Sequence, residues 1–275
     1  MQKDRLYFVT DAHLGSGPDS PQRERELCTL LDNIEPHCHT LVLLGDMFDF
    51  WFTYRHLVPR GHVRLLGKLA AMADNGTEIH YFTGNHDMWL FDYLTNEIGL
   101  TQHEQPATLT FGECTFLIGH GDGLGNTDPS FNRLRRLFRS PFCQRMFKLL
   151  PSAFTFGIAH RWSDNNKVRH AQQDTLRYLG DEREGIVQYC HQRLAQEHFD
   201  YCVFGHRHTP LARQLQQGTT YINVGDWLIN RNYAYFAPGQ GLTLLDNRQP
   251  TPLANCPISE PPQTPSQPPE NQHQQ

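Results

Sequence analysis

Short apolar runs repeatedly end in clusters of histidine, aspartate or asparagine along this chain. The clearest case ends in Gly84-Asn85-His86-Asp87, where an amide, an imidazole and a carboxylate follow one another. The four similar clusters are Asp11-Ala-His13, Gly45-Asp46, Gly119-His120 and Gly205-His206-Arg-His208. In open α/β sheets, ligands bind beyond the carboxyl ends of the strands, where residues from distant parts of the chain can meet. The pattern therefore predicts an α/β sheet with one polar site at its edge.

Hydrophobic periodicity predicts the elements that carry these clusters. Buried strands are expected at 5–10, 40–44 and 78–83, and helices are expected at 21–35 and 60–75. This alternation is typical of parallel strands joined by short crossovers. A hairpin is expected over 107–118, and further strands are expected at 200–204, 211–215, 219–224, 233–237 and 241–246.

The chain divides into one domain and a tail. We expect a single domain over residues 1–247, which includes a mostly helical insertion at 125–198. Residues 248–275 are rich in Pro, Gln, Ser and Asn and have almost no large apolar side chains. Such a composition is typical of disorder, so we expect no structure in this tail.

Several features favour a cytoplasmic protein. No apolar run approaches the roughly 18 to 20 residues that cross a bilayer. The N-terminal segment lacks the apolar region of a signal peptide. The seven cysteines form no CxxC pair, which is typical of reduced thiols. The net charge of −5 disfavours a general nucleic-acid-binding role.

The donor types in the five clusters are typical of a two-metal site. Two carboxylates, one amide and four imidazoles are the candidate ligands: Asp11, His13, Asp46, Asn85, His120, His206 and His208. These donors suit Mn²⁺, Fe²⁺ or Zn²⁺, and the absence of cysteine disfavours a structural zinc. Two ions sharing one carboxylate, roughly 3.5 to 4 Å apart, would use all the donors. Each cluster alone could be an ordinary turn or helix cap, but chance does not explain the ordered set.

The ordered set resembles the calcineurin-like metallophosphoesterases over residues 11–208. The resemblance implies a four-layer α-β-β-α sandwich with a two-metal site. It implies that Asp11, His13 and His208 hold one metal, that Asn85, His120 and His206 hold the other, and that Asp46 bridges them. It also implies that His86 does not ligate but acts on the phosphate as an acid or electrostatic stabiliser, with Asp87 orienting its imidazole.

The helical insertion combines positive charge with apolar faces. Residues 131–150 include six Arg or Lys and no acid, and two short amphipathic helices are expected with a break at Ser140-Pro141. Such helices suit contact with anionic lipids, and they could also form a lid over an acyl-chain groove. A helical subdomain that packs on itself and a nucleic-acid-binding helix are the alternatives. The acidic total and the high Phe and Leu content disfavour the second.

Three segments resemble the UDP-2,3-diacylglucosamine diphosphatases: VTDAHLG, GDMFDFW and HGDGLGNTDPSFNRLRRLFRSPFCQRMFKLLP. The resemblance implies Mn²⁺-dependent cleavage of UDP-2,3-diacylglucosamine to UMP and 2,3-diacylglucosamine 1-phosphate in lipid A synthesis. It implies peripheral action at the cytoplasmic face of the inner membrane, with a helical lid over the acyl chains. Matching positions suggest substrate contacts at Trp51, Asp128, Asn166 and Lys167.

His86 departs from this closer resemblance, because the best-known diphosphatases carry Arg at that position. The histidine follows the general phosphoesterase pattern instead. Two alternatives therefore stay open: a general metallophosphoesterase acting on a soluble nucleotide or a phosphoprotein, and a non-catalytic, metal-bound scaffold that binds a membrane or a partner. Since all seven ligand positions and His86 are filled, the sequence favours an enzyme.

Overall fold

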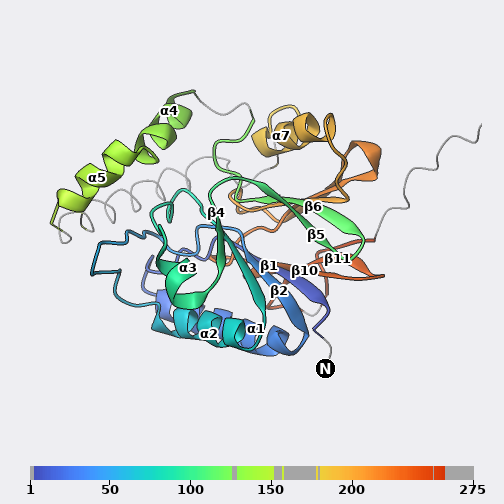
Figure 1. Cartoon of the computed structure of the whole chain (residues 1–275). Coiled ribbons are helices and arrows are strands. Elements are labelled where there is room, and N and C mark those ends of the chain that lie inside the picture. The colour runs from blue at the N-terminus through green and yellow to red at the C-terminus, as the bar shows by residue number, and fades with distance from the viewer. Residues whose placement is uncertain are drawn as a thin grey trace, which may run out of the picture.

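Two β-sheets lie face to face between layers of helices (Figure 1). The computed structural model describes residues 3–125, 129–151, 157, 178, 180–249 and 251–257. The first sheet contains β1 (Arg5–Val9), β2 (Cys38–Leu43), β3 (Glu78–Phe82), β4 (Thr101–His103), β10 (Asn232–Ala237), β11 (Gly241–Asp246) and β12 (Ala254–Cys256). Within the described residues its order is β12-β11-β10-β1-β2-β3-β4. Strands β1 to β4 are mutually parallel. Each of β10, β11 and β12 pairs antiparallel with its neighbours in the sheet.

The second sheet has a parallel centre flanked by antiparallel edges. It contains β5 (Ala107–Phe111), β6 (Cys114–Gly119), β7 (Tyr201–Phe204), β8 (Leu211–Gln214) and β9 (Thr220–Asn223). In the described part of the chain its order is β5-β6-β7-β9-β8. Strands β6, β7 and β9 are parallel, whereas β5 and β8 pair antiparallel with their neighbours. The parallel strands end at one edge, which is where the polar clusters follow them.

Helices cover the outer face of each sheet. The helices α1 (Ser20–Ile34), α2 (Val63–Asp74) and α3 (Tyr93–Ile98) lie on the first sheet, and α7 (Gly185–Leu194) lies on the second. The helices α4 (Pro129–Phe138) and α5 (Pro141–Leu149) project beyond the sandwich in Figure 1. Short 3₁₀ turns occur at Glu35–His37 and Gln216–Gly218.

Among the described residues, three apolar clusters hold the four layers together. One joins α1, α2 and α3 to the first sheet, and its α1 members recur at helical spacing: Leu27, Leu30, Leu31 and Ile34. The second fills the space between the sheets, where Phe8 of β1 packs against Phe116 of β6 with ring centroids 6.2 Å apart. The third joins α7 to the second sheet through Val187 and Cys190. The predicted four-layer α-β-β-α fold is thus confirmed.

Two predicted boundaries are wrong. The tail was expected to be unstructured from 248, yet Ala254–Cys256 form β12, which pairs with Leu242–Leu244 of β11. Backbone pairing supplies the order there, and it does not depend on large side chains. The helical insertion was expected to extend to 198, but α7 is buried against the second sheet and belongs to the sandwich. Ser140 separates α4 from α5 as predicted, and its hydroxyl caps α5 by accepting the Cys143 N–H.

No helix in the described residues is long and apolar enough to span a membrane.

Candidate metal centre

Each of the five polar clusters follows the carboxyl end of a parallel strand. Asp11 and His13 follow β1, Asp46 follows β2, and Asn85 follows β3 in the first sheet. His120 follows β6, and the pair His206 and His208 follows β7, in the second sheet. The two sheets face each other, so the strand ends bring donors from both sheets to one place. The convergence predicted from sequence is therefore present.

Five of the predicted ligands have left-handed backbone conformations. The φ angles are 51° at Asp11, 42° at His13, 50° at Asp46, 68° at His206 and 52° at His208. This conformation is uncommon for residues with a side chain and costs free energy at each position. The surrounding structure imposes it in order to aim the side chains. Such strain concentrates at functional sites.

Glycines let the strand ends approach one another closely. A Cβ at Gly45 would lie 2.7 Å from the backbone N of Gly84, and a Cβ at Gly84 would lie 2.7 Å from the backbone N of Asp46. A Cβ at Gly205 would lie 2.7 Å from Asp11 Oδ2. Only glycine fits at these places. The glycines before Asp46, Asn85 and His206 are therefore required by packing.

Gly84→Ala is expected to disorder the Asp46 carboxylate, because the added methyl group would overlap it. We expect hydrolytic activity to fall at least about a hundredfold, since small displacements at a reacting centre have effects of this size. Metal content measured by mass spectrometry should fall as well. Gly67→Ala in α2 is the matched control, because a Cβ there meets nothing within 4 Å. Full metal content and activity in Gly84→Ala would contradict this geometry.

Asp11, His13 and His208 form the first donor group. Their potential ligand atoms lie within 4.8 Å of one another. Asp11 Oδ1 is 3.2 Å from His208 Nε2 and 3.8 Å from His13 Nε2. The other oxygen of Asp11 accepts hydrogen bonds from the Thr10 hydroxyl and the His206 N–H. One carboxylate oxygen is thus held by the protein, and the other faces the histidines.

His120 and His206 form the second donor group. Ligand atoms of His120, His206 and Asp46 also lie within 4.8 Å of one another. The Nδ1 atom of His120 is 2.7 Å from the Leu44 carbonyl, which makes Nδ1 the donor and leaves Nε2 as the ligand atom. Asn85 lies between two residues that contact Asp46, namely Gly84 and His86.

Asp46 lies between the two donor groups. Its Oδ2 atom is 3.3 Å from His120 Nε2 and 3.9 Å from His13 Nε2. Its Oδ1 atom accepts the backbone N–H of His86 at 2.8 Å. A carboxylate that reaches a histidine of each group has the placement that a bridging ligand needs.

The donor set fits divalent metal ions. Within the described residues, several buried atoms of the site have no partner in hydrogen-bonding geometry: Asp11 Oδ1, His13 Nε2, Asn85 Oδ1 and His120 Nε2. Buried polar atoms are nearly always satisfied, so each such atom requires an explanation. Oxygen and imidazole donors that converge in this way are typical ligands for Mn²⁺, Fe²⁺ or Zn²⁺. Divalent metal binding accounts for the atoms that the protein leaves unsatisfied.

The buried carboxylates favour positive charge in the site. Burial lowers the pKa of His13, but the carboxylates of Asp11 and Asp49 outweigh burial and raise this pKa to about 10. Burial opposes protonation of His120 as well, yet the charge of Asp46 raises its pKa to about 10. Burial and the neighbouring His120 lower the pKa of His206 to about 4. Two of the imidazoles therefore hold protons that a metal ion would replace.

Metal binding at pH 7 is expected to release about two protons, because ligating imidazoles must be neutral. His13 and His120 have pKa values of about 10 and are protonated below that pH without metal. Metal affinity should therefore increase as the pH rises from 6 to 9. Titration calorimetry with Mn²⁺ in two buffers of different ionisation enthalpy measures the protons released. Identical heats in the two buffers would contradict these protonation states.

The predicted pairing of Asp87 with the His86 imidazole is wrong. The Asp87 carboxylate is fully buried and accepts the backbone N–H groups of Met47 and Gly84 and the Tyr81 hydroxyl. It fixes the loops after β2 and β3. Burial, followed by the charge of Asp46, raises the pKa of Asp87 to about 6.

Asp49 is the residue that holds His86 in place. The Nδ1 atom of His86 lies 2.9 Å from the Asp49 carbonyl, which can only accept, so Nδ1 carries the proton. The Asp49 carboxylate lies 3.5 Å from His13 Nδ1 and so also orients a candidate ligand. The imidazole of His86 lies edge-on to that of His13, with centroids 4.7 Å apart. Sequence reasoning missed Asp49, although its spacing of three from Asp46 was available as a signal.

Trp51, a predicted substrate contact, lies in the core of the first sheet and its helices. Its side chain is fully buried, packs against Phe48 and Tyr93, and donates its indole N–H to the Thr53 hydroxyl. A wholly buried ring has no surface to offer, and Trp51 belongs to the core under the metal loops. The other three predicted substrate contacts lie outside the described residues: Asp128, Asn166 and Lys167.

A buried arginine supports the loop that carries Asp11 and His13. Arg23 of α1 donates to the carbonyls of Ala12, His13 and Ser16. The sequence offers no signal for this role, because Arg23 stands in a run of charged residues that reads as exposed. The arginine fixes the backbone that aims the first donor group.

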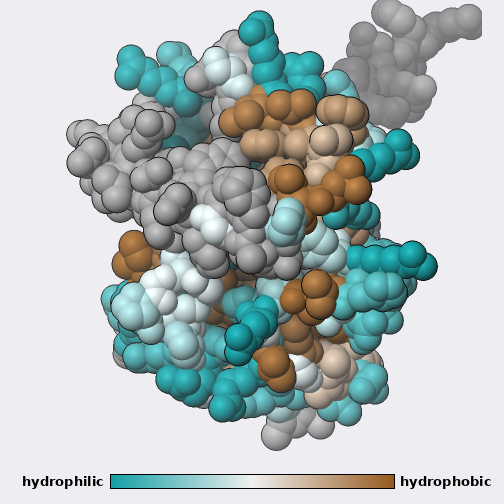
Figure 2. All heavy atoms as spheres, turned by 90° about the vertical axis from the view of Figure 1, so that its left-hand side faces the viewer, coloured by the Kyte–Doolittle hydropathy of each residue, from teal (hydrophilic) through white to brown (hydrophobic). Residues whose placement is uncertain are grey.

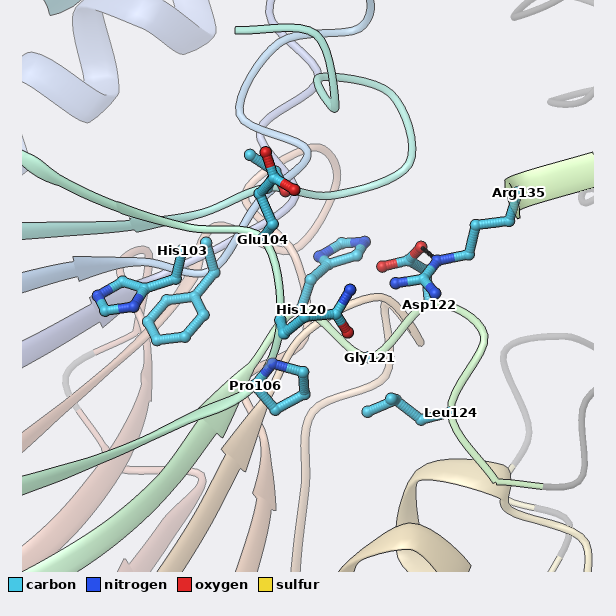
Figure 3. A pocket seen from close by; sticks show the side chains of 11 residues that line it. His103, Glu104, Pro106, His120, Gly121, Asp122, Leu124 and Arg135 are labelled. Atoms are coloured by element: carbon cyan, nitrogen blue, oxygen red, sulfur yellow. Dashed lines mark hydrogen bonds and ion pairs between the residues drawn. The ribbon is translucent and has the colours of Figure 1, made fainter. Parts of the chain in front are cut away.

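A pocket opens beside the second donor group (Figure 3). Its lining includes His103, Glu104, His120, Asp122 and Arg135. Figure 3 shows Asp122 and Arg135 pointing toward each other, and their ion pair joins the loop after His120 to α4. Burial opposes ionisation of Asp122, but His120 and Arg135 keep its pKa below the usual value. This ion pair was not predicted, and it attaches α4 next to the candidate metal centre.

Comparison with known proteins identifies the relatives of this chain. A UDP-2,3-diacylglucosamine hydrolase of Porphyromonas gingivalis is 34% identical over 256 residues, covering 88% of this chain and 97% of that protein. The protein of the same name from Proteus mirabilis is 28% identical, covering 74% of this chain and 81% of its own length. That from Aeromonas salmonicida is 25% identical, covering 85% and 90%.

The match to a family model covers all of the candidate ligands. The model of the calcineurin-like phosphoesterase family matches residues 4–210, a range that contains all seven candidate ligands. The fold agrees with the resemblance stated from the motifs, and six of the seven candidate ligands lie in the two donor groups or bridge between them. The chain belongs to the calcineurin-like phosphoesterase family.

Proposed function

We propose that this chain hydrolyses the pyrophosphate bond of UDP-2,3-diacylglucosamine, with release of UMP and 2,3-diacylglucosamine 1-phosphate. The observation that carries the proposal is the 34% identity to the Porphyromonas gingivalis hydrolase, which extends over nearly the whole of both chains. The reaction would belong to lipid A synthesis. It would place the protein on the cytoplasmic face of the inner membrane, where this lipid substrate resides.

Two divalent ions, preferably Mn²⁺, would be held by the two donor groups. Asp11, His13 and His208 would hold one ion, and Asn85, His120 and His206 would hold the other. Asp46 would bridge them, which its contacts with His13 and His120 support. When bound, such ions lower the pKa of a water molecule and offset negative charge on the phosphoryl group.

His86 would act on the substrate rather than on a metal. Its Nδ1 atom is engaged by the Asp49 carbonyl, so Nε2 is the atom that can exchange a proton with the substrate. Burial lowers the pKa of His86, although the charge of Asp46 opposes this. A phosphoryl group bound nearby adds negative charge and favours the imidazolium. The imidazolium can stabilise the transition state or donate a proton to the departing oxygen.

The helices α4 and α5 would contact the anionic membrane and cover the acyl chains. Their exposed apolar side chains include Leu137, Phe142 and Leu149. Exposed basic residues, among them Arg133 and Arg145, accompany them. This combination suits a bilayer interface, where apolar groups enter the acyl boundary and cations meet lipid phosphates.

The products test the proposal. Purified protein supplied with Mn²⁺ and UDP-2,3-diacylglucosamine should yield UMP and 2,3-diacylglucosamine 1-phosphate, identified by chromatography and phosphorus NMR. Chelation of the metal should stop the reaction, and added Mn²⁺ should restore it. Release of UDP, or no release of nucleotide, would overturn the proposed reaction.

A further inference from the structure

A second segment that combines basic and exposed apolar residues lies far from α4 and α5 in the sequence. Residues 53–64 join the loop after β2 to the first turn of α2 and include three exposed arginines, Arg55, Arg60 and Arg64. Leu57 and Val63 are 60% and 76% exposed, respectively. Large apolar side chains that are this exposed, and that stand among arginines, suit an interaction surface.

Aromatic contacts connect this segment to α5. Phe147 of α5 packs against Phe52 and Trp89, with ring centroids 5.8 and 4.6 Å apart. Phe52 immediately precedes residues 53–64 and contacts Tyr54 within them at 4.7 Å. Trp89 lies three residues after His86 and donates its indole N–H to the Phe138 carbonyl at the end of α4. Phe52, Trp89 and Phe147 thus form one aromatic cluster that anchors both basic segments. Trp89 places this cluster close in sequence to His86.

The helix α5 directs a second set of apolar side chains away from this cluster. Phe142 and Leu149 are 72% and 78% exposed, and Met146 is also exposed. Their spacing of four and three residues places them on one face of the helix. Phe147, which packs inward, lies on a different face. Figure 1 places the loop before α2 and the C-terminal end of α5 on the same side, and Figure 2 shows apolar side chains among hydrophilic ones on that side.

The charge of these segments contrasts with that of the rest of the chain. Residues 53–64 contain three of the 24 basic residues, and residues 129–151 contain six. Neither segment contains any of the 29 acidic residues, although the whole chain has a net charge of −5. Such an asymmetry orients the basic side toward an anionic surface.

We propose that residues 53–64 and α5 together form one docking face for an anionic phospholipid bilayer. Leu57 and the exposed side of α5 would enter the interfacial layer, and Arg55, Arg60 and Arg145 would contact lipid phosphates. Exposed apolar groups on two separate elements, each accompanied by arginines, match the layered chemistry of a bilayer interface. The inference rests on the proposed function, because a lipid substrate gives the chain a reason to dock, and it adds residues 53–64 as a second contact.

Co-sedimentation of the full chain with vesicles tests the docking face. The protein should bind vesicles of phosphatidylcholine with phosphatidylglycerol and bind pure phosphatidylcholine far less. Leu57→Asp should lower the partition coefficient about tenfold, as expected for a lost buried leucine. The double variant Arg55→Glu, Arg60→Glu should lower it about a hundredfold. Leu253→Asp is the matched control. It should bind normally, because Leu253 is exposed but lies next to β12, outside residues 53–64 and α5.

Three outcomes would overturn the docking face. They are unchanged vesicle binding by Leu57→Asp, equal binding of the wild type to both vesicle types, and preference for duplex DNA over vesicles. A second readout separates docking from catalysis. Leu57→Asp should hydrolyse a detergent-dispersed substrate normally and a vesicle-embedded one slowly. If the wild type hydrolyses neither but the vesicle results hold, the proposed reaction fails and the docking face stands.

Discussion

Replacing Asp46 by asparagine is expected to lower hydrolysis at least about a thousandfold, which is the scale of losing a main electrostatic element of a catalytic site. Asp46 is the carboxylate that reaches both donor groups through His13 and His120. The amide would keep the hydrogen bond from the His86 N–H but would lose the negative charge. Bound metal, measured by mass spectrometry, should fall below two ions per chain.

Asp74→Asn is the matched control for this variant. Asp74 ends α2, is exposed and lies outside the candidate metal centre. It should keep full activity and metal content, and circular dichroism should show both variants folded. Unchanged turnover in Asp46→Asn would contradict the two-metal assignment.

Replacing His86 by alanine is expected to lower kcat by about a hundredfold to ten-thousandfold, the range for loss of a general acid. Metal content should stay unchanged, because the seven other donors remain. His86→Arg should recover activity to within about tenfold of wild type if a positive charge beside the phosphate is what the site requires. The arginine is also the residue that the resemblance to the diphosphatases implies at this position.

His198→Ala is the control for removal of a histidine, because this side chain is exposed beside Asp200. It should leave kcat unchanged. Loss of a bound ion in His86→Ala would make His86 a ligand, which is geometrically open because its ring lies with His13 and Asp46. Full activity in His86→Ala would remove it from the reaction altogether.

The central strands of the first sheet could be predicted because the apolar runs and the polar clusters that end them indicate the same strand ends. β1, β2 and β3 are mostly apolar and are buried over most of their length, as expected of strands covered on both faces. The polar residues after them had to lie at one edge once the strands were parallel. The spatial meeting of six of the candidate ligands, Asp11, His13, Asp46, His120, His206 and His208, therefore followed from topology.

Contacts that depend on tertiary packing could not be predicted. Asp87 is adjacent to His86 in sequence, but their side chains bond different partners. The His86 imidazole bonds the Asp49 carbonyl, and the Asp87 carboxylate accepts backbone N–H groups. The core position of Trp51 depends on Tyr93 of α3, an element of only six residues that was not predicted. Strand β4 has three residues, too few for a period, and exists through pairing with β3.

The structured end of the chain shows the same limit. The residues of β12 lie among Pro, Gln and Asn, so composition indicated disorder. The strand is held by pairing with β11, and the Tyr201 hydroxyl donates to the Cys256 carbonyl. Hydrogen-bond partners in the rest of the fold order this segment. The amino-acid composition of the segment does not indicate these partners.

We propose that this site hydrolyses a lipid-linked pyrophosphate. The most direct measurement compares kcat/KM, with Mn²⁺, for UMP release from UDP-2,3-diacylglucosamine and for cleavage of bis(4-nitrophenyl) phosphate, a simple soluble phosphodiester. We expect kcat/KM for the lipid-linked substrate to be at least about a thousandfold higher, because remote binding energy is used in the transition state. No UMP release together with rapid cleavage of the soluble diester would contradict it.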